Sequence, residues 1–127
     1  MRADKLTTKS QEALAEAQNL AQGMQHQELQ PEHLLKAILL PEYGIVTAIV
    51  RKLGGQKEHL LESVDREIEK LPQVSGSSQL YMSPLLRQTI DIAFKEAKNL
   101  GDEYVSVEHL LLGLSEMQDS GAAVQGG

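Results

Sequence analysis

The chain has 127 residues and carries 12 Lys and Arg against 18 Asp and Glu, for a net charge of −6. This length suits one domain and is too short for two. The acidic balance argues against a protein that binds nucleic-acid phosphates, because such proteins need a basic face. The sequence has no cysteine, which excludes a disulfide scaffold, a thiolate zinc site and a cysteine nucleophile.

Membrane and phosphate-loop signatures are missing from the sequence. No stretch approaches the roughly 20 apolar residues of a membrane span, and residues 1–10 hold no apolar run of signal-peptide length. We therefore expect a cytoplasmic protein that contacts no membrane. The sequence has no Gly-x-x-x-x-Gly-Lys-Ser/Thr loop, so we expect no nucleotide cofactor in this domain.

Apolar residues spaced by three and four predict two helices in the first part of the chain. The first follows Thr7 or Thr8 as its N-cap and ends near Gly23. The second begins at Pro31, where a proline loses no useful hydrogen bond, and Pro41 ends it.

Four further helices are predicted downstream, for a total of six. They cover residues 45–53, 56–70, 83–100 and 106–117, and turn-forming residues 72–80 separate the second from the third of them. No segment alternates at period two for long enough to make a strand, so the fold class is all-α. The candidate core consists of the apolar residues on the inward helix faces, chiefly Ala13, Leu14, Ala17, Leu20, Ala21, Met24, Leu34, Leu35, Ile38, Leu39, Leu60, Leu61, Val64, Ile68, Leu71, Leu86, Ile90, Ala93, Phe94, Ala97, Val107, Leu110, Leu111 and Leu114.

The sequence repeats itself. A shift that places residue 32 on residue 108 aligns Glu32-His33-Leu34-Leu35 with Glu108-His109-Leu110-Leu111. The same shift keeps apolar residues in phase over the preceding 25 or so positions, which chance does not readily produce. We infer two copies of one helical unit, related by a pseudo-two-fold axis, with the second copy shorter than the first.

His33 and His109 stand at the start of predicted helices and raise the question of a metal site. Zinc requires three or four ligands at set spacings, and the next two residues after each histidine are core leucines. His26 and His59 show no ligand spacing either. We therefore expect no metal, and each histidine to hydrogen-bond a neighbour.

Glu32 and Glu108 allow two interpretations. A carboxylate near a helix N-terminus gains about 0.3–1 kcal/mol from the helix dipole, which is a purely structural role. Related by the pseudo-two-fold axis, the two glutamates could equally form anionic pockets for a basic ligand. Thr7 and Ser83 are N-caps by position, and a cap can also contact a ligand. Tyr104, beside Asp102, is expected to be partly exposed and able to contact an unfolded segment.

Three motifs in order resemble the Clp repeats at the N-terminus of Clp family chaperones. Residues 6–14, 17–21 and 31–35 resemble the first repeat, residues 71–76 resemble the linker of the ClpB disaggregase branch, and residues 101–111 resemble the second repeat. The resemblance implies one N-terminal domain over residues 1–127. Its parts are repeat one at about 6–71, a linker at 72–80, repeat two at about 81–122, and a frayed tail over 118–127 with a truncated last helix.

The resemblance also implies a function. In that family the domain binds unfolded or aggregated polypeptides and passes them to a hexameric ring of AAA+ ATPase modules, which would hold ATP and Mg and lie outside this chain. The family takes part in protein disaggregation in the stress response, with DnaK-type co-chaperones or adaptor proteins as partners. The isolated domain is expected to be a monomer. Residues Thr7, Asp102 and Glu108 match the substrate-binding surface of the ClpB branch. We add Tyr104 to the candidate substrate-binding residues because it lies close to Asp102 in the sequence.

Two alternatives remain open from the sequence. In ClpC relatives the residues that match Glu32, Glu108, Thr7 and Ser83 receive phosphorylated arginine, so an adaptor or phosphoarginine docking domain is possible. A small hydrolase using His33 or His109 ranks last, since the sequence offers no nucleophile elbow. Finally, the short second copy predicts an exposed apolar patch around Leu111 and Leu114.

Overall fold

The computed structural model describes residues 2–74 and 79–119. In this part of the chain nine elements follow one another: η1 (Ala3–Lys5, a 3-10 helix), α1 (Thr8–Gly23), β1 (Glu28–Leu29), α2 (Pro31–Leu39), α3 (Gly44–Lys52), α4 (Lys57–Glu69), β2 (Tyr81–Met82), α5 (Pro84–Asn99) and α6 (Val107–Asp119). The predicted all-α class is confirmed, and each helix lies within a few residues of its predicted range.

The helix ends follow local chemistry. The side chain of Thr7 accepts a hydrogen bond from the Ser10 amide at the start of α1, and Ser83 accepts one from the Leu86 amide at the start of α5. Each bond satisfies an amide that the helix itself leaves unpaired, and is worth about 1 kcal/mol. After α5 the chain turns at Gly101, whose φ of 77° lies in the left-handed region that glycine adopts at little cost.

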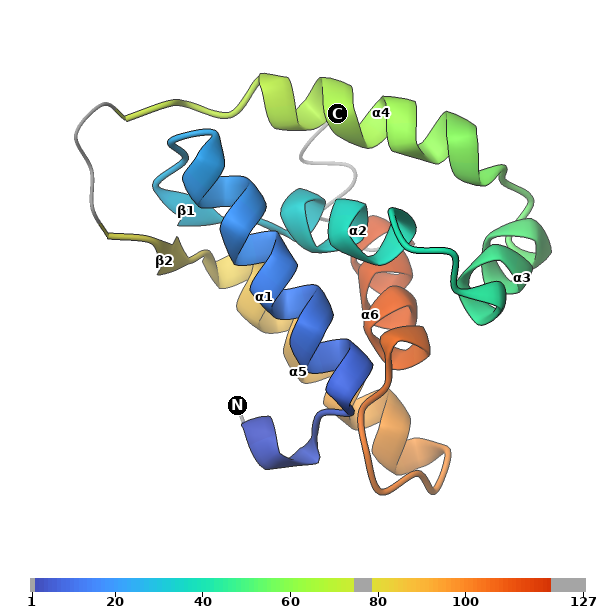
Figure 1. Ribbon diagram of the computed structural model, residues 1–127. Helices are drawn as coiled ribbons and strands as arrows, with labels where there is room; N and C mark the ends of the chain where they lie inside the picture. Colours follow the sequence, from blue (N-terminus) through green and yellow to red (C-terminus); the bar gives the residue numbers. More distant parts are fainter. Residues whose placement is uncertain (1, 75–78, 120–127) are drawn as a thin grey trace.

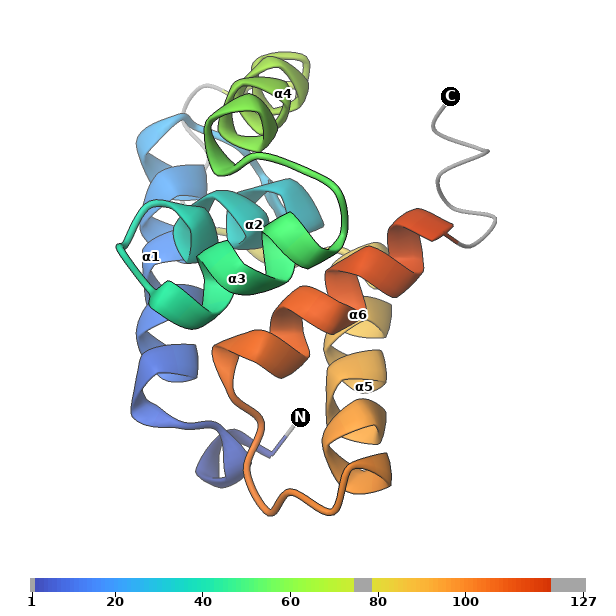
Figure 2. The same cartoon turned by 90° about the vertical axis from the view of Figure 1, so that its right-hand side faces the viewer.

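α2 lies at the centre of the molecule (Figure 1). It packs against α1, α4 and α6, while α5 packs along α6 and α3 packs on both α4 and α6. α4 lies across one end of the bundle, over α2, in both views (Figures 1 and 2). The fully buried side chains Leu34, Ile38 and Leu39 come from α2, and Leu110 comes from α6. The core is therefore built around the two helices that carry the repeated Glu-His-Leu-Leu motif.

Two backbone contacts confirm the predicted internal symmetry. Leu6 bridges Val105 in parallel, and Leu29 pairs with Met82 in parallel through strands β1 and β2. The repeat shift maps residue 6 to 82 and residue 29 to 105, so the two pairs are equivalent by the pseudo-two-fold relation. The segment before α1 thus pairs with the segment before α6, and the segment before α5 pairs in the same way with the segment before α2.

The two-residue strands were not predicted, because period-two alternation cannot be detected in two residues. They leave the fold class unchanged. They join the repeats through backbone hydrogen bonds from the Tyr81 amide to the Gln27 carbonyl (2.9 Å) and from the Ser83 amide to the Leu29 carbonyl (3.0 Å).

The predicted exposed patch around Leu111 and Leu114 is wrong. Leu111 is 4% exposed and Leu114 is 8% exposed, because α3 of the first repeat packs on α6 and α5 packs closely along it. The close approach occurs at Gly113, where an added Cβ would lie 2.6 Å from the carbonyl oxygen of Thr89. Helices of the first repeat therefore pack on α6, the helix on which the exposed patch was predicted.

The predicted frayed tail began at residue 118, but α6 continues to Asp119. The rest of that tail, the expected truncated last helix at 121–127, and part of the linker lie outside the described residues. Within the described ranges no single helix is long and apolar enough to cross a membrane, and α2 and α3 reach that length only as a pair bent by 116°.

Candidate functional site

The polar residues predicted in the second repeat gather around the turn that leads from α5 into α6. Val105 is the centre of this region, because Asp102 and Glu108 stand three residues before and after it. The Thr7 amide donates to the Val105 carbonyl (3.0 Å), which ties the start of α1 to this turn. We call the predicted set Thr7, Asp102, Tyr104 and Glu108 the second-repeat polar surface.

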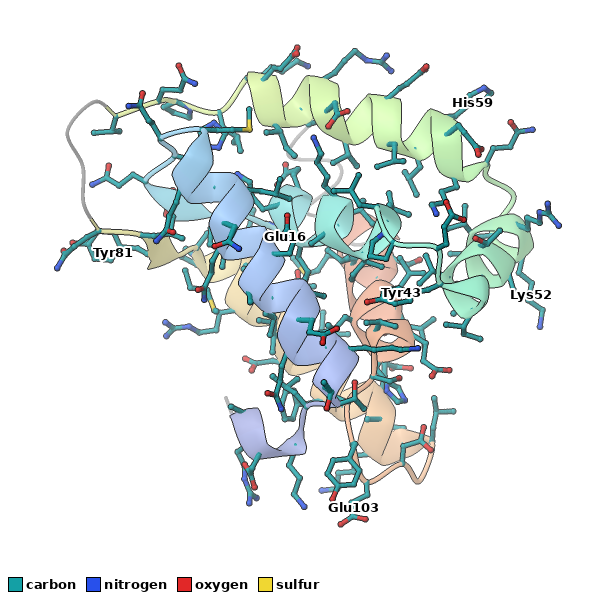
Figure 3. The ribbon with its side chains drawn as sticks, viewed as in Figure 1. Glu16, Tyr43, Lys52, His59, Tyr81 and Glu103 are labelled. Atoms are coloured by element: carbon teal, nitrogen blue, oxygen red, sulfur yellow. The ribbon has the colours of Figure 1, made fainter. Side chains whose placement is uncertain are left out.

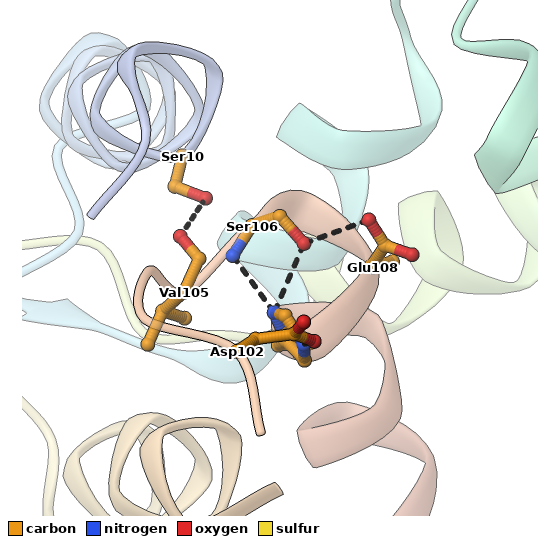
Figure 4. Close-up of polar contacts among 6 residues, drawn as sticks. Ser10, Asp102, Val105, Ser106 and Glu108 are labelled. Atoms are coloured by element: carbon orange, nitrogen blue, oxygen red, sulfur yellow. Dashed lines mark hydrogen bonds and ion pairs between the residues drawn. The ribbon is translucent and has the colours of Figure 1, made fainter. Parts of the chain in front are cut away.

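Ser10 fixes the α1 side of this surface. Its side chain is fully buried, and its hydroxyl donates to the Val105 carbonyl at 2.9 Å (Figure 4). The Thr7 hydroxyl in turn donates to Ser10 Oγ at 3.0 Å. The buried Ser10 hydroxyl thus both accepts and donates a hydrogen bond, and breaking either bond would cost free energy. These two bonds fix the position of Thr7 relative to Val105.

His109 fixes the other side. Its Nδ1 accepts from the Ser106 amide (2.9 Å), so the ring proton must be on Nε2. Nε2 lies 2.8 Å from Asp102 Oδ2 and donates to it. The imidazole is 4% exposed, whereas the Asp102 side chain is 51% exposed. A buried ring therefore holds a carboxylate that is still open to solvent.

The order Ser106, His109, Asp102 resembles a catalytic triad, but the hydrogen bonds oppose that function. A serine nucleophile needs a free ring nitrogen to take its proton. The Ser106 hydroxyl lies 2.9 Å from both His109 Nδ1 and Glu108 Oε1 (Figure 4). The single lone pair on Nδ1 already accepts from the Ser106 amide, so the hydroxyl donates its proton to the Glu108 carboxylate. The arrangement is a helix cap, which argues against the hydrolase alternative.

The rim of the surface carries mixed charge and an aromatic ring. Tyr104 is 48% exposed, as predicted. Lys5 Nζ lies 5.6 Å from the centre of its ring and 3.7 Å from Glu103 Oε1. An exposed tyrosine beside carboxylates offers an apolar face and a polar edge to a ligand.

The first repeat holds an equivalent but different arrangement. Ser83 takes the place of Thr7, and its amide donates to the Leu29 carbonyl. Ser83 is only 2% exposed, however, and its hydroxyl accepts from the Leu86 amide, so it faces the interior. Glu32 follows Leu29 by three residues, as Glu108 follows Val105. The structure therefore places Thr7 with Glu108 and Ser83 with Glu32, at two separate positions.

One pair of residues near the first position was not predicted. His26 takes the place that Asp102 has in the second repeat, and its Nδ1 lies 2.8 Å from His33 Nε2. Burial lowers the pKa of His26, and burial together with the facing His26 ring lowers the pKa of His33 to about 4. The repeat shift aligns residue 26 with residue 102 and could have revealed this pair. Within residues 2–74 and 79–119, no group of three or more His, Asp or Glu side chains is arranged to hold a metal ion.

The fold and the two related positions define a double helical repeat with polar surfaces at its repeat junctions. Residues 5–124 match the family described as Clp repeat (R) N-terminal domain, and the chain belongs to this family.

The chaperone protein ClpB of Nitratidesulfovibrio vulgaris is 42% identical over 116 residues, which are 88% of this chain and 13% of that protein. Among solved structures, the Hsp104 N-terminal domain from Candida albicans has a TM-score of 0.79 at 23% identity and covers 91% of this chain and 76% of that one. The N-domain of a ClpV in complex with a VipB peptide has a TM-score of 0.75 at 20% identity, over 91% of this chain and 71% of that one. The chain thus spans about one eighth of the length of the first relative, and the two structures support the fold.

Proposed function

We propose that this chain is the substrate-binding N-terminal domain of a ClpB-like disaggregase, and that it engages unfolded or aggregated polypeptides through the second-repeat polar surface. One observation carries the proposal: the half-exposed Asp102 carboxylate is fixed by the buried ring of His109. Such a group is preorganised for a cationic or amide donor, because little freedom is lost when a ligand binds it. The identity with ClpB relatives supports the assignment to that branch.

The chemistry of the surface indicates which polypeptides it favours. Asp102 and Glu108 attract Lys and Arg side chains and exposed backbone amides, and the ring of Tyr104 packs against apolar side chains. The net charge of −6 adds a long-range preference for basic segments. An unfolded ligand must be ordered on a small surface, so each contact is weak. Several copies in one assembly would raise the effective concentration.

The remaining parts of this proposal concern the rest of the protein. ATP and Mg would be bound by AAA+ modules outside this chain, which would form a hexameric ring in the cytoplasm and work with DnaK-type co-chaperones. The chain itself would bind no nucleotide, and its role would be binding rather than catalysis. Its match to the Clp repeat N-terminal domain family and its similarity to 13% of a ClpB chaperone support this division of labour.

A binding assay tests the proposal. Labelled unfolded casein is titrated with this chain and with Asp102→Asn/Glu108→Gln, followed by fluorescence anisotropy. We expect weak binding that the double variant lowers about 3- to 10-fold, as for two solvent-accessible charge contacts. The matched control is Glu67→Gln/Glu69→Gln, which removes the same charge from exposed positions of α4. Equal binding by both variants, or no binding by the unchanged chain, would refute the proposal.

A second candidate is docking of phosphorylated arginine, supported by the two positions that each combine a hydroxyl with a glutamate. The buried Ser83 hydroxyl makes the first position less accessible than the second. Titration with free phosphoarginine distinguishes the candidates. If phosphoarginine binds and Glu32→Ala/Glu108→Ala abolishes it while casein binding persists, docking is an additional function. If phosphoarginine does not bind, this candidate is excluded.

A further inference from the structure

The His26–His33 pair has only one arrangement of protons that satisfies its hydrogen bonds. His33 Nδ1 accepts from the Gln30 amide at 3.0 Å, so the proton of the neutral His33 ring is on Nε2. Nε2 donates to His26 Nδ1 at 2.8 Å. His26 must then carry its own proton on Nε2. His33 is fully buried and His26 is 5% exposed, so water cannot easily replace either bond.

A further proton has no free position in this pair. The two remaining lone pairs are on Nδ1 of His26 and Nδ1 of His33, and both already accept hydrogen bonds. A proton on His26 Nδ1 would face the N–H of His33, and a proton on His33 Nδ1 would face the N–H of Gln30. Either choice places two donors opposite each other in a buried site, which breaks one of the two bonds.

The second repeat shows the contrast. There Asp102 occupies the position of His26, and a carboxylate accepts from His109 Nε2 whether the ring is neutral or charged. The first repeat has no carboxylate at this position. The ionisable groups on the surrounding elements are Glu28 on β1, Glu32 and Lys36 on α2, Tyr81 on β2, and Glu69 and Lys70 at the last residue and the C-cap of α4. The last turns of α1 (residues 17–24) and the linker start (residues 71–74) carry none.

The segment that carries His26 also holds both ends of the linker between the repeats. At the linker start, the Val74 amide donates to the Gln25 carbonyl at 2.8 Å, and Gln73 Nε2 donates to the Met24 carbonyl at 3.1 Å. At the linker end, the Tyr81 amide donates to the Gln27 carbonyl. Tyr81 lies at the outer edge of the molecule, on β2 (Figure 3).

Two features make this segment easy to release. Gln25 has a φ of 60°, a left-handed conformation that costs a non-glycine residue about 1 kcal/mol and persists only when neighbours enforce it. A cavity of about 320 Å³ lies beside His26, lined among others by Pro72, Val74 and Tyr81. The linker start and end therefore border this cavity, and hydrogen bonds to backbone carbonyls attach them to the segment.

We propose that the His26–His33 pair is a proton-sensitive latch for the inter-repeat linker: protonation of the pair frees the segment 25–28 and, with it, both linker ends, while the helices stay folded. This inference does not depend on the proposed function. The sign follows from the pKa values. The folded state favours the neutral rings, so the latch holds above about pH 6.5 and loosens as pH falls toward the His33 pKa of about 4.

Amide hydrogen exchange tests the latch on this chain. The amides of Val74 and Tyr81 report on the linker ends, and the Thr7 and Val105 amides of the equivalent bridge serve as an internal reference. After correction for intrinsic exchange rates, we expect linker-end protection to fall on the order of twentyfold between pH 7 and pH 5, with little change at the reference amides. Equal changes at both bridges, or no change at either, would overturn the latch.

A matched variant separates titration from general acid loosening. In His26→Asn, the side-chain oxygen replaces Nδ1 as acceptor but does not take up a proton in this range. We expect it to lose the part of the pH dependence at Val74 and Tyr81 that comes from the His26 ring, while the buried His33 ring still contributes its own part. The control His59→Asn, at an exposed position on α4 (Figure 3), should behave like the unchanged chain. If His26→Asn keeps the full pH dependence, the latch is refuted.

A spectroscopic measurement covers the case in which His26→Asn does not fold. Nitrogen NMR of the unchanged chain at pH 7.5 reads the tautomer of each ring directly. The latch requires protons on Nε2 of both His26 and His33. A proton on Nδ1 of either ring would contradict it.

Discussion

Replacement of Gly113 by alanine tests the close packing of α5 on α6. An added Cβ would lie 2.6 Å from the Thr89 carbonyl oxygen and 3.3 Å from the Ala93 nitrogen, both backbone atoms that cannot rotate away. The helices must move apart, which costs about 1–3 kcal/mol for an overpacked core. Alanine recovers up to about 1 kcal/mol in helix propensity. We expect the free energy of unfolding to fall by about 1–2 kcal/mol for Gly113→Ala.

Gly23 provides the matched control. It lies at the end of α1 and an added Cβ there meets nothing within 4 Å. Gly23→Ala should stabilise the protein by about 0.5–1 kcal/mol, because it restricts the unfolded chain without a clash. Urea denaturation of both variants measures the difference. If Gly113→Ala stabilises the protein as much as Gly23→Ala does, the close approach of α5 and α6 is not present in solution.

Two further predictions concern buried polar groups. Ser10→Ala removes the hydroxyl that donates to the Val105 carbonyl and should lower the free energy of unfolding by about 1–2 kcal/mol. The control Ser63→Ala, at an exposed position, should change it by less than about 0.5 kcal/mol. Equal effects of the two substitutions in urea denaturation would contradict the buried network. The neutral His33 should make the free energy of unfolding fall by about 2–3 kcal/mol from pH 6.5 to pH 4, since its pKa is about 4 when folded. His33→Asn should remove this fall, and an unchanged pH profile in that variant would show that other groups cause it.

The helices were predictable because their ends are marked by short-range chemistry. Thr7 is the N-cap of α1 and Ser83 is the N-cap of α5, while Pro31 is the first residue of α2. The internal symmetry was also visible, since the repeated Glu-His-Leu-Leu motif contains a histidine and a leucine that are buried in both repeats.

Contacts between the repeats were not predictable in the same way. Leu111 and Leu114 are buried on α6, which packs against helices of the other repeat, α3 among them, and a pattern within one repeat says nothing about such contacts. The His26–His33 hydrogen bond joins a loop to a helix, outside any periodicity. The predicted site residues Thr7, Asp102 and Glu108 do lie around one turn, but Glu32 and Ser83 lie at the other junction.

Mapping of chemical shifts during a titration tests the central claim most directly. Unfolded casein is added to this chain labelled with nitrogen-15, and amide shifts are followed up to millimolar concentration. The account predicts shifts that cluster at Thr7, Asp102, Tyr104 and Glu108, with α4 unaffected. Shifts confined to α4, or none at all, would contradict the account.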